Sequence, residues 1–66
     1  MRKEALLEIY NDAHWFIDNG DKIYGASVLK WLYEFNERLT KTGFDGLDTE
    51  GIQKTMAKLK QEIEEL

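Results

Sequence analysis

The chain of 66 residues contains no cysteine and no proline, and it has one histidine and one serine. Without cysteine it can form no disulfide bond and none of the zinc motifs that depend on cysteine ligands, and one histidine offers little to a transition metal. A chain this short buries only about 60% of the surface that its unfolded form exposes. Its stability is therefore expected to come from close helix packing or from self-association.

Long apolar runs are also absent. No segment approaches the roughly 18 apolar residues of a membrane span, and the opening MRKEALLEIY lacks the apolar core of a signal peptide. We therefore expect a cytoplasmic protein without a membrane partner. The 13 acidic and 9 basic side chains give a net charge of −4, which disfavours nucleic acid as a partner because phosphate neutralisation needs a basic surface.

Apolar residues recur at helical spacing along the chain, with no sustained strand-type alternation. The spacing predicts one all-α domain, residues 1–66, built as a small three-helix bundle in up-down-up order. The three helices are expected at about 3–19, 22–42 and 49–65.

Glycine and aspartate punctuate these helices. Gly20 and Gly43 are expected to end the first and second helices in left-handed turns. Asp21 and Asp48 are expected to cap the helices that follow. Phe44 is expected to fold back under the bundle.

Each expected helix carries an apolar face. The first is formed by Leu6, Ile9, Ala13, Phe16 and Ile17. The second is formed by Val28, Leu32, Phe35 and Leu39, flanked by Tyr24, Leu29 and Trp31, of which Trp31 is assigned to the core. The third is a narrow seam of Ile52, Met56, Leu59, Ile63 and Leu66.

The seam follows the alternating steps of four and three residues found in coiled coils. It is thinner than a helix packed on two neighbours usually needs. The third helix is therefore expected to contact one neighbouring groove or a copy of itself, and we expect a homodimer formed through helix three or helix one.

The first helix carries a second stripe, opposite its apolar face and made of Glu4, Glu8, Asn11, Trp15 and Asp18. Trp15 decides the interpretation of this stripe. A partly buried Trp15 would belong to the fold, since tryptophan is seldom fully buried even in cores. An exposed Trp15 would be a candidate interface anchor, because tryptophan is enriched at binding hot spots.

Acidic residues end the first and third helices, against the helix dipole. In an up-down-up bundle the two ends share a pole, where Asp18, Asp21, Glu62, Glu64 and Glu65 are expected to crowd. Salt is then expected to stabilise the protein by screening this repulsion.

Motifs for chemistry are weak, so no enzyme activity, cofactor or metal is expected. His14 and Asp18 lie four residues apart, but we interpret His14 as a histidine held by a local hydrogen bond to a carboxylate or carbonyl, and not as a general base or a metal ligand. The acidic segment DGLDTE fails the EF-hand pattern and suits turns and helix caps. The lysines of the third helix, Lys54, Lys58 and Lys60, are followed directly by glutamates, which disfavours a DNA-reading helix.

The sequence is compatible with two alternative functions, and DNA binding by a small regulator is a weaker third. The first is a small acidic interaction module, a regulator or inhibitor of the phage or bacterial type, that binds a basic protein surface through the Trp15 stripe. The alternative is a structural subunit that assembles into a helical homo-oligomer through the seam of the third helix.

Overall fold

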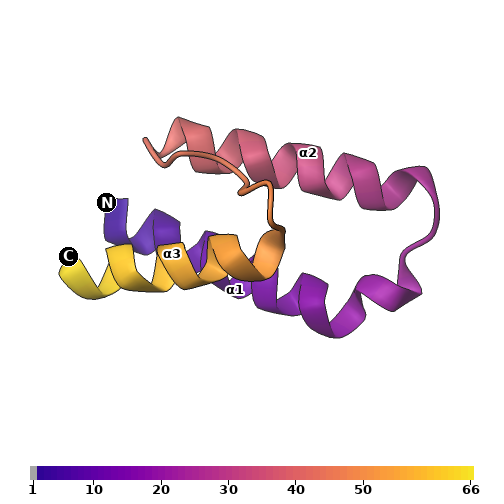
Figure 1. Cartoon of the computed structure of the whole chain (residues 1–66), viewed down its shortest axis with the longest axis horizontal. Helices are drawn as coiled ribbons and strands as arrows, with labels where there is room; N and C mark the ends of the chain where they lie inside the picture. The colour runs from indigo at the N-terminus through magenta and orange to yellow at the C-terminus, as the bar shows by residue number, and fades with distance from the viewer. Residues whose placement is uncertain (1) are drawn as a thin grey trace.

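The computed structural model describes residues 2–66, and the regular structure in this range is helical throughout. The elements are α1 (Arg2–Asn19), the short 3-10 helix η1 (Gly20–Lys22), α2 (Ala26–Lys41) and α3 (Ile52–Glu65) (Figure 1). The predicted all-α, three-helix class is confirmed. Between residues 2 and 66, no helix is both long and apolar enough to cross a membrane.

Glycine backbones set where α2 and α3 begin, several residues later than the sequence pattern suggested. Gly25 and Gly51 precede the two helices with φ values of 55° and 114°, a region that side chains with a Cβ disfavour. Neither helix has a side-chain cap. The predicted capping roles of Asp21 and Asp48 are therefore wrong. Gly20 also differs from its prediction, because it starts η1 without a positive φ.

Gly43 ends α2 as predicted, with φ of 82°. Its N–H donates to the Thr40 carbonyl at 3.1 Å, and the Phe44 N–H donates to the Leu39 carbonyl at 3.0 Å. These two bonds form a Schellman motif, in which the residue after the glycine packs on the last turn of the helix. Leu39 and Phe44 both join the core, so this helix end turns the chain under the bundle.

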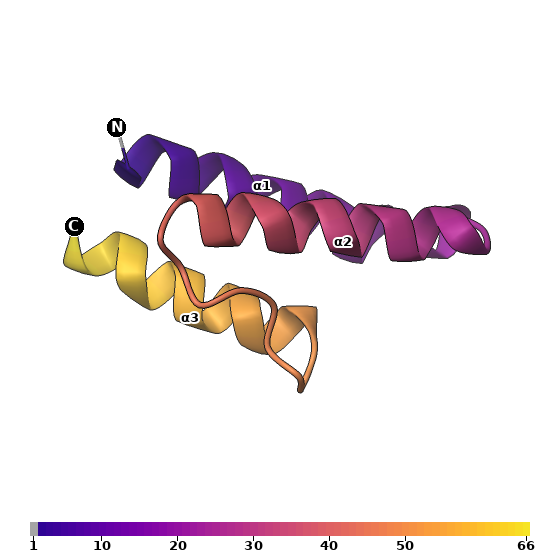
Figure 2. The same cartoon turned by 90° about the horizontal axis from the view of Figure 1, so that it is seen from above.

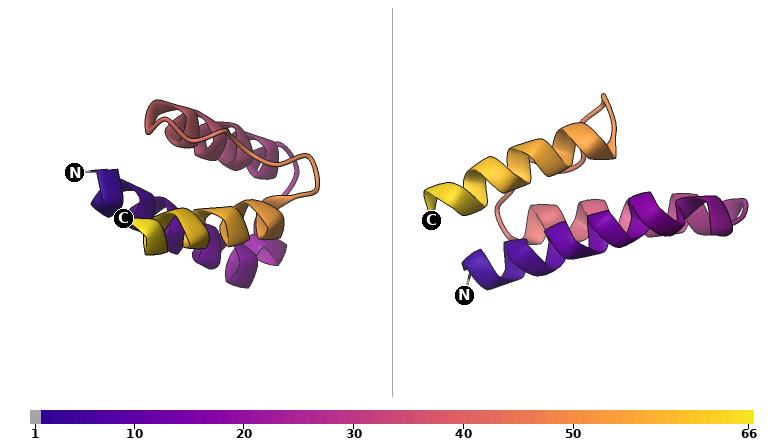
Figure 3. Two further views of the ribbon diagram at one scale, coloured as in Figure 1. Left: turned by 60° about the vertical axis from the view of Figure 1, so that its left-hand side comes forward. Right: turned by 90° about the horizontal axis from the view of Figure 1, so that it is seen from below.

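The direction of α3 differs from the predicted up-down-up order. Arg2 of α1 forms an ion pair with Glu62 of α3 at 2.8 Å, and its Nε donates to the Thr42 carbonyl just after α2 at 3.0 Å. The start of α1 therefore lies beside the ends of both other helices. α3 runs antiparallel to α1 and parallel to α2, with both termini at one end of the molecule (Figures 1 and 3).

The connector 42–51 makes this order possible. It returns along the bundle before α3 begins (Figure 1), whereas up-down-up order would need only a short turn. An extended chain of this length reaches roughly 30 Å, which exceeds the roughly 24 Å length of α2.

The expected acidic pole does not form, because α3 has the opposite direction. Asp18 and Asp21 lie at the far end of α1 from Glu62, which instead contacts Arg2 (Figure 2). Without this crowding of acidic residues, the structure gives no reason to expect that salt stabilises the protein.

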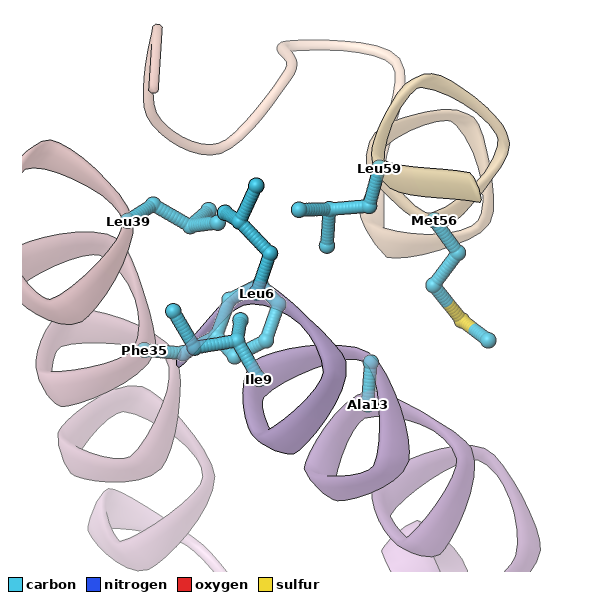
Figure 4. Close-up of a cluster of buried hydrophobic side chains, with 7 residues drawn as sticks. All are labelled: Leu6, Ile9, Ala13, Phe35, Leu39, Met56 and Leu59. Carbon is cyan, nitrogen blue, oxygen red and sulfur yellow. The ribbon is translucent and has the colours of Figure 1, made fainter. Parts of the chain in front are cut away.

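The core lies where the three helices meet, and α1 contacts both α2 and α3. Side chains from all three helices converge there (Figure 4): Leu6, Ile9, Ala13, Phe35, Leu39, Met56 and Leu59. Two residues predicted for the face of α1 are less buried than expected, since Phe16 is half-buried and Ile17 is 40% exposed.

The seam of α3 is used within its own chain. Met56 and Leu59 are buried, and Ile52 and Ile63 pack against the same core. Only Leu66, at 55% exposure, lies outside it. The seam is narrow because α3 packs mainly on one helix, α1, so it does not offer a second copy the continuous surface that an oligomer seam needs.

Leu59→Ala is expected to lower the free energy of unfolding by about 2–5 kcal/mol, because it leaves a cavity in the core. Leu66→Ala, seven positions further along the same seam, is expected to change it by less than about 0.5 kcal/mol. Urea unfolding followed by circular dichroism measures both. A Leu59→Ala effect that grows with protein concentration would contradict the intramolecular role of the seam.

The direction of α3 predicts the order of two distances. Spin labels on cysteines replacing Lys3 and Glu65 are expected to lie close together, because both positions are at the same end of the bundle. Labels replacing Asp18 and Glu65 are expected to be separated by most of the roughly 27 Å length of α1. Pulsed electron paramagnetic resonance measures both distances, and an up-down-up bundle would reverse their order.

Candidate functional site

The outer face of α1 is the stripe of Glu4, Glu8, Asn11, Trp15 and Asp18, and all five side chains are exposed. Trp15 is 50% exposed. The stripe lies opposite Leu6, Ile9 and Ala13, because one uninterrupted helix carries both sets at its own periodicity. We call this surface the α1 outer face.

Neighbouring aromatic residues explain why Trp15 is left outside. Phe16 turns inward and stacks on Trp31 of α2, with ring centroids 4.2 Å apart and an interplanar angle of 20°. Trp31 in turn stacks on the buried Phe35, at 5.0 Å and 15°. Trp31 is half-buried against the core, as predicted, and this stack joins α1 to α2 without Trp15.

The backbone under Trp15 is held to the end of α1. The Asn19 side-chain amide donates to the Trp15 carbonyl at 2.9 Å, a second tie between Trp15 and the last residue of the helix. The indole is therefore carried by a regular, anchored last turn of the helix.

Some acidic side chains on and beside the α1 outer face lie close to basic residues, and others do not. Asp12, beside the stripe, forms an ion pair with Arg38 of α2, and Glu8 borders a groove that Arg38 and Lys41 also line. Within residues 2–66, Glu4 and Asp18 form no ion pair. Along the stripe, the acidic side chain nearest to Trp15 is Asp18, one turn further along the helix.

Three large hydrophobic side chains in α2 or just before it are exposed: Tyr24 at 81%, Leu29 at 71% and Tyr33 at 66%. The sequence pattern made no prediction for Tyr33. Tyr24 and Leu29 had been expected to flank the core. Tyr24 lies just before α2 and Leu29 in its first turn, where the α1–α2 hairpin extends beyond the start of α3 (Figure 2). In the sequence, the signal for this uncovered end of the hairpin was the apolar pattern of the third helix, which is narrower than those of the first two.

His14 lies on an exposed edge of α1, where its ring meets Tyr10 edge-on at 4.8 Å. Tyr10, His14 and Ile17 line a shallow groove with residues of α3, among them Met56. No hydrogen bond joins His14 to Asp18 in the part of the chain described. Residues 2–66 also contain no group of three or more side chains placed to hold a metal ion.

Asp48 of the acidic connector forms contacts within the connector and with α3. The Asp48 carboxylate accepts the Glu50 N–H at 2.8 Å and forms an ion pair with Lys58 of α3, in line with the predicted turn chemistry. The Asp48 N–H donates to the hydroxyl of the buried Thr55 at 2.8 Å. These contacts fix the entry into α3.

A second anchor ties the connector to α2. The Asn36 side-chain oxygen accepts the Leu47 N–H at 2.8 Å. A Cβ on Gly46 would lie 2.8 Å from that same oxygen, and Gly46 has φ of 91°, so glycine is required there.

Comparison with protein-family models, with curated proteins and with solved structures finds no match for this chain.

Asp48→Asn tests the anchor at α3, because asparagine keeps the oxygen that accepts the Glu50 N–H and removes the charge opposite Lys58. The Lys58 hydrogen bond, followed by that of Glu50, lowers the pKa of Asp48 below its ordinary 3.8. Charged Asp48 therefore stabilises the fold fully above that value, and the effect disappears as pH falls through the lowered pKa.

The variant is expected to unfold at lower urea concentration than the wild type at neutral pH, by a small margin because the Lys58 side chain is 48% exposed to solvent. The difference is expected to shrink as the pH falls below 3.8. Urea midpoints at several pH values measure it, and a gap that widens on acidification would contradict the assignment.

Proposed function

We propose that this protein is a small non-enzymatic interaction module whose α1 outer face binds a basic surface of another protein. The observation that carries the proposal is Trp15, half exposed on a regular helix while its neighbour Phe16 is stacked against α2. Phe16, Trp31 and Phe35 form the aromatic stack between α1 and α2 without Trp15, so the exposed indole is free to contact a partner.

The chemistry around Trp15 favours a cationic partner. Tryptophan is the best aromatic acceptor for a lysine or arginine placed over its face, and it is enriched among the residues that carry most of the binding energy of interfaces. Asp18 adds a carboxylate one turn away, which would attract a basic surface during encounter. A helix already ordered in the free protein also loses little conformational entropy on binding.

The other two functions have less support. The seam that would build a helical homo-oligomer is packed against α1. Two of the three lysines that a DNA-reading α3 would use form ion pairs instead, Lys54 with Glu50 and Lys58 with Asp48. Self-association stays a prediction, and a dimer would have to use another surface.

Trp15→Ala is expected to abolish capture of the partner from the native host, and to weaken binding of the purified partner by at least about 2 kcal/mol, roughly thirty-fold. Asp18→Lys is expected to weaken the same binding more strongly at low salt than at high salt. Pull-down followed by titration calorimetry measures these effects.

Leu66→Ala is the matched control, because Leu66 is an exposed apolar residue just after α3, at the opposite end of the molecule from Trp15. It is expected to keep affinity within about two-fold of wild type. Circular dichroism checks that each variant folds. A partner that binds Trp15→Ala as tightly as wild type, or whose contact surface is acidic, would refute the proposal.

A further inference from the structure

A groove lies between α1 and α3, beside the α1 outer face. It has a volume of about 330 Å³ and is lined by Tyr10, His14, Ile17, Gln53, Met56 and Ala57. None of these residues is a lysine, an arginine or an acidic residue. Ile17 is open to solvent there at 40% exposure, and the short side chain of Ala57 leaves room on the side of α3. The groove therefore suits an apolar group.

The size of the groove suits one large side chain. Sites for small molecules have volumes of about 300–1,000 Å³ and bury most of their ligand. This groove is at the lower end of that range, and it is shallow and open. A side chain that projects from the surface of another molecule fits it better than a free ligand does.

Helical spacing joins the groove to the α1 outer face. Asp18 lies four residues after His14 and three after Trp15, so it neighbours both side chains on the surface of α1. Asn11 lies three residues before His14 and four before Trp15, and it neighbours both in the same way. All four side chains are exposed. The groove and the indole therefore belong to one continuous surface, with a carboxylate between them.

We propose that the basic partner of the α1 outer face also inserts a large apolar side chain into the groove between α1 and α3. The inference rests on the proposed function and makes the partner more specific. The partner's surface is amphipathic, with a lysine or arginine for Trp15 and Asp18 and a leucine-like side chain for the groove. Because Asp18 neighbours both sites, the two side chains have to come from neighbouring positions of the partner, such as one turn apart on a helix.

Charge complementarity favours this occupant over a second copy of the chain. Asp18 at the border of the groove attracts the partner's cation, whereas two copies that each carry a net charge of −4 repel one another. The groove then adds selectivity, because burial of one large apolar side chain changes affinity about ten-fold or more.

Two alanine-based helical peptides of about 18 residues test the inference. Both carry lysines along one side. One of them also carries leucines one turn from the lysines, where the other keeps alanine. The leucine peptide is expected to bind the wild type at least about ten-fold more tightly than the alanine peptide, because a leucine leaves water for the groove. Fluorescence anisotropy of dye-labelled peptides measures both affinities.

Ala57→Phe fills the groove from the side of α3. It is expected to remove the preference for the leucine peptide and to keep binding of the alanine peptide within about two-fold of wild type. Ile17→Ser removes an apolar wall without filling the groove and is expected to reduce the preference as well. Ala26→Phe, the same change at an exposed site at the start of α2, is the matched control and is expected to keep it. Circular dichroism checks that each variant folds.

Trp15→Ala separates the inference from the function on which it rests, because it is expected to weaken binding of both peptides equally. The inference alone is overturned when Trp15→Ala does so but the two peptides bind the wild type equally, or Ala57→Phe keeps the preference. When Trp15→Ala changes neither affinity, the proposed function is overturned and the inference falls with it. A dimer in sedimentation equilibrium that Ala57→Phe dissociates would show a second copy in the groove and would also overturn the inference.

Discussion

The ridge of Leu6, Ile9 and Ala13 on α1 is the constraint on which the rest of the molecule depends. α2 and α3 both pack on α1, and these three side chains are almost completely buried between them (Figure 4). Because the same face of α1 packs against both α2 and α3, the opposite face is exposed to solvent. The same packing that stabilises the fold thus places Trp15 on the outside.

The connector 42–51 determines the direction of α3, and it combines apolar contacts of Phe44 and Leu47 with directed hydrogen bonds. Asn36 holds it to α2, while Asp48 and the buried Thr55 hold it to α3. A buried hydroxyl is tolerated there because it both accepts the Asp48 N–H and donates to the Gly51 carbonyl. The path of the connector is therefore fixed by a few hydrogen bonds together with the packing of these two apolar side chains.

Helical periodicity was enough to predict the number of helices, the buried ridge of α1 and the position of Trp15 on the stripe opposite that ridge, because each depends on angles within one helix. Whether Trp15 is exposed could not be predicted, since a turn or the end of another helix could have covered it. The direction of α3 could not be predicted, since the seam from Ile52 to Leu66 has the same pattern in either direction. Tyr24 and Leu29 were misplaced for a related reason. Their burial depends on how far α3 reaches along the hairpin, which is a relation between elements.

The meeting of Arg2 with Glu62 brings the beginning and the end of the helical fold within a side chain's reach of each other. A linker of a few residues could join these ends, and the chain could then be opened within 42–51 without cutting a helix. Such a circular permutant would make α3 and α1 consecutive, turning the remote pair of helices into a local hairpin. In such a permutant the contacts of the shared ridge of α1 would be the same as in the natural order of the helices.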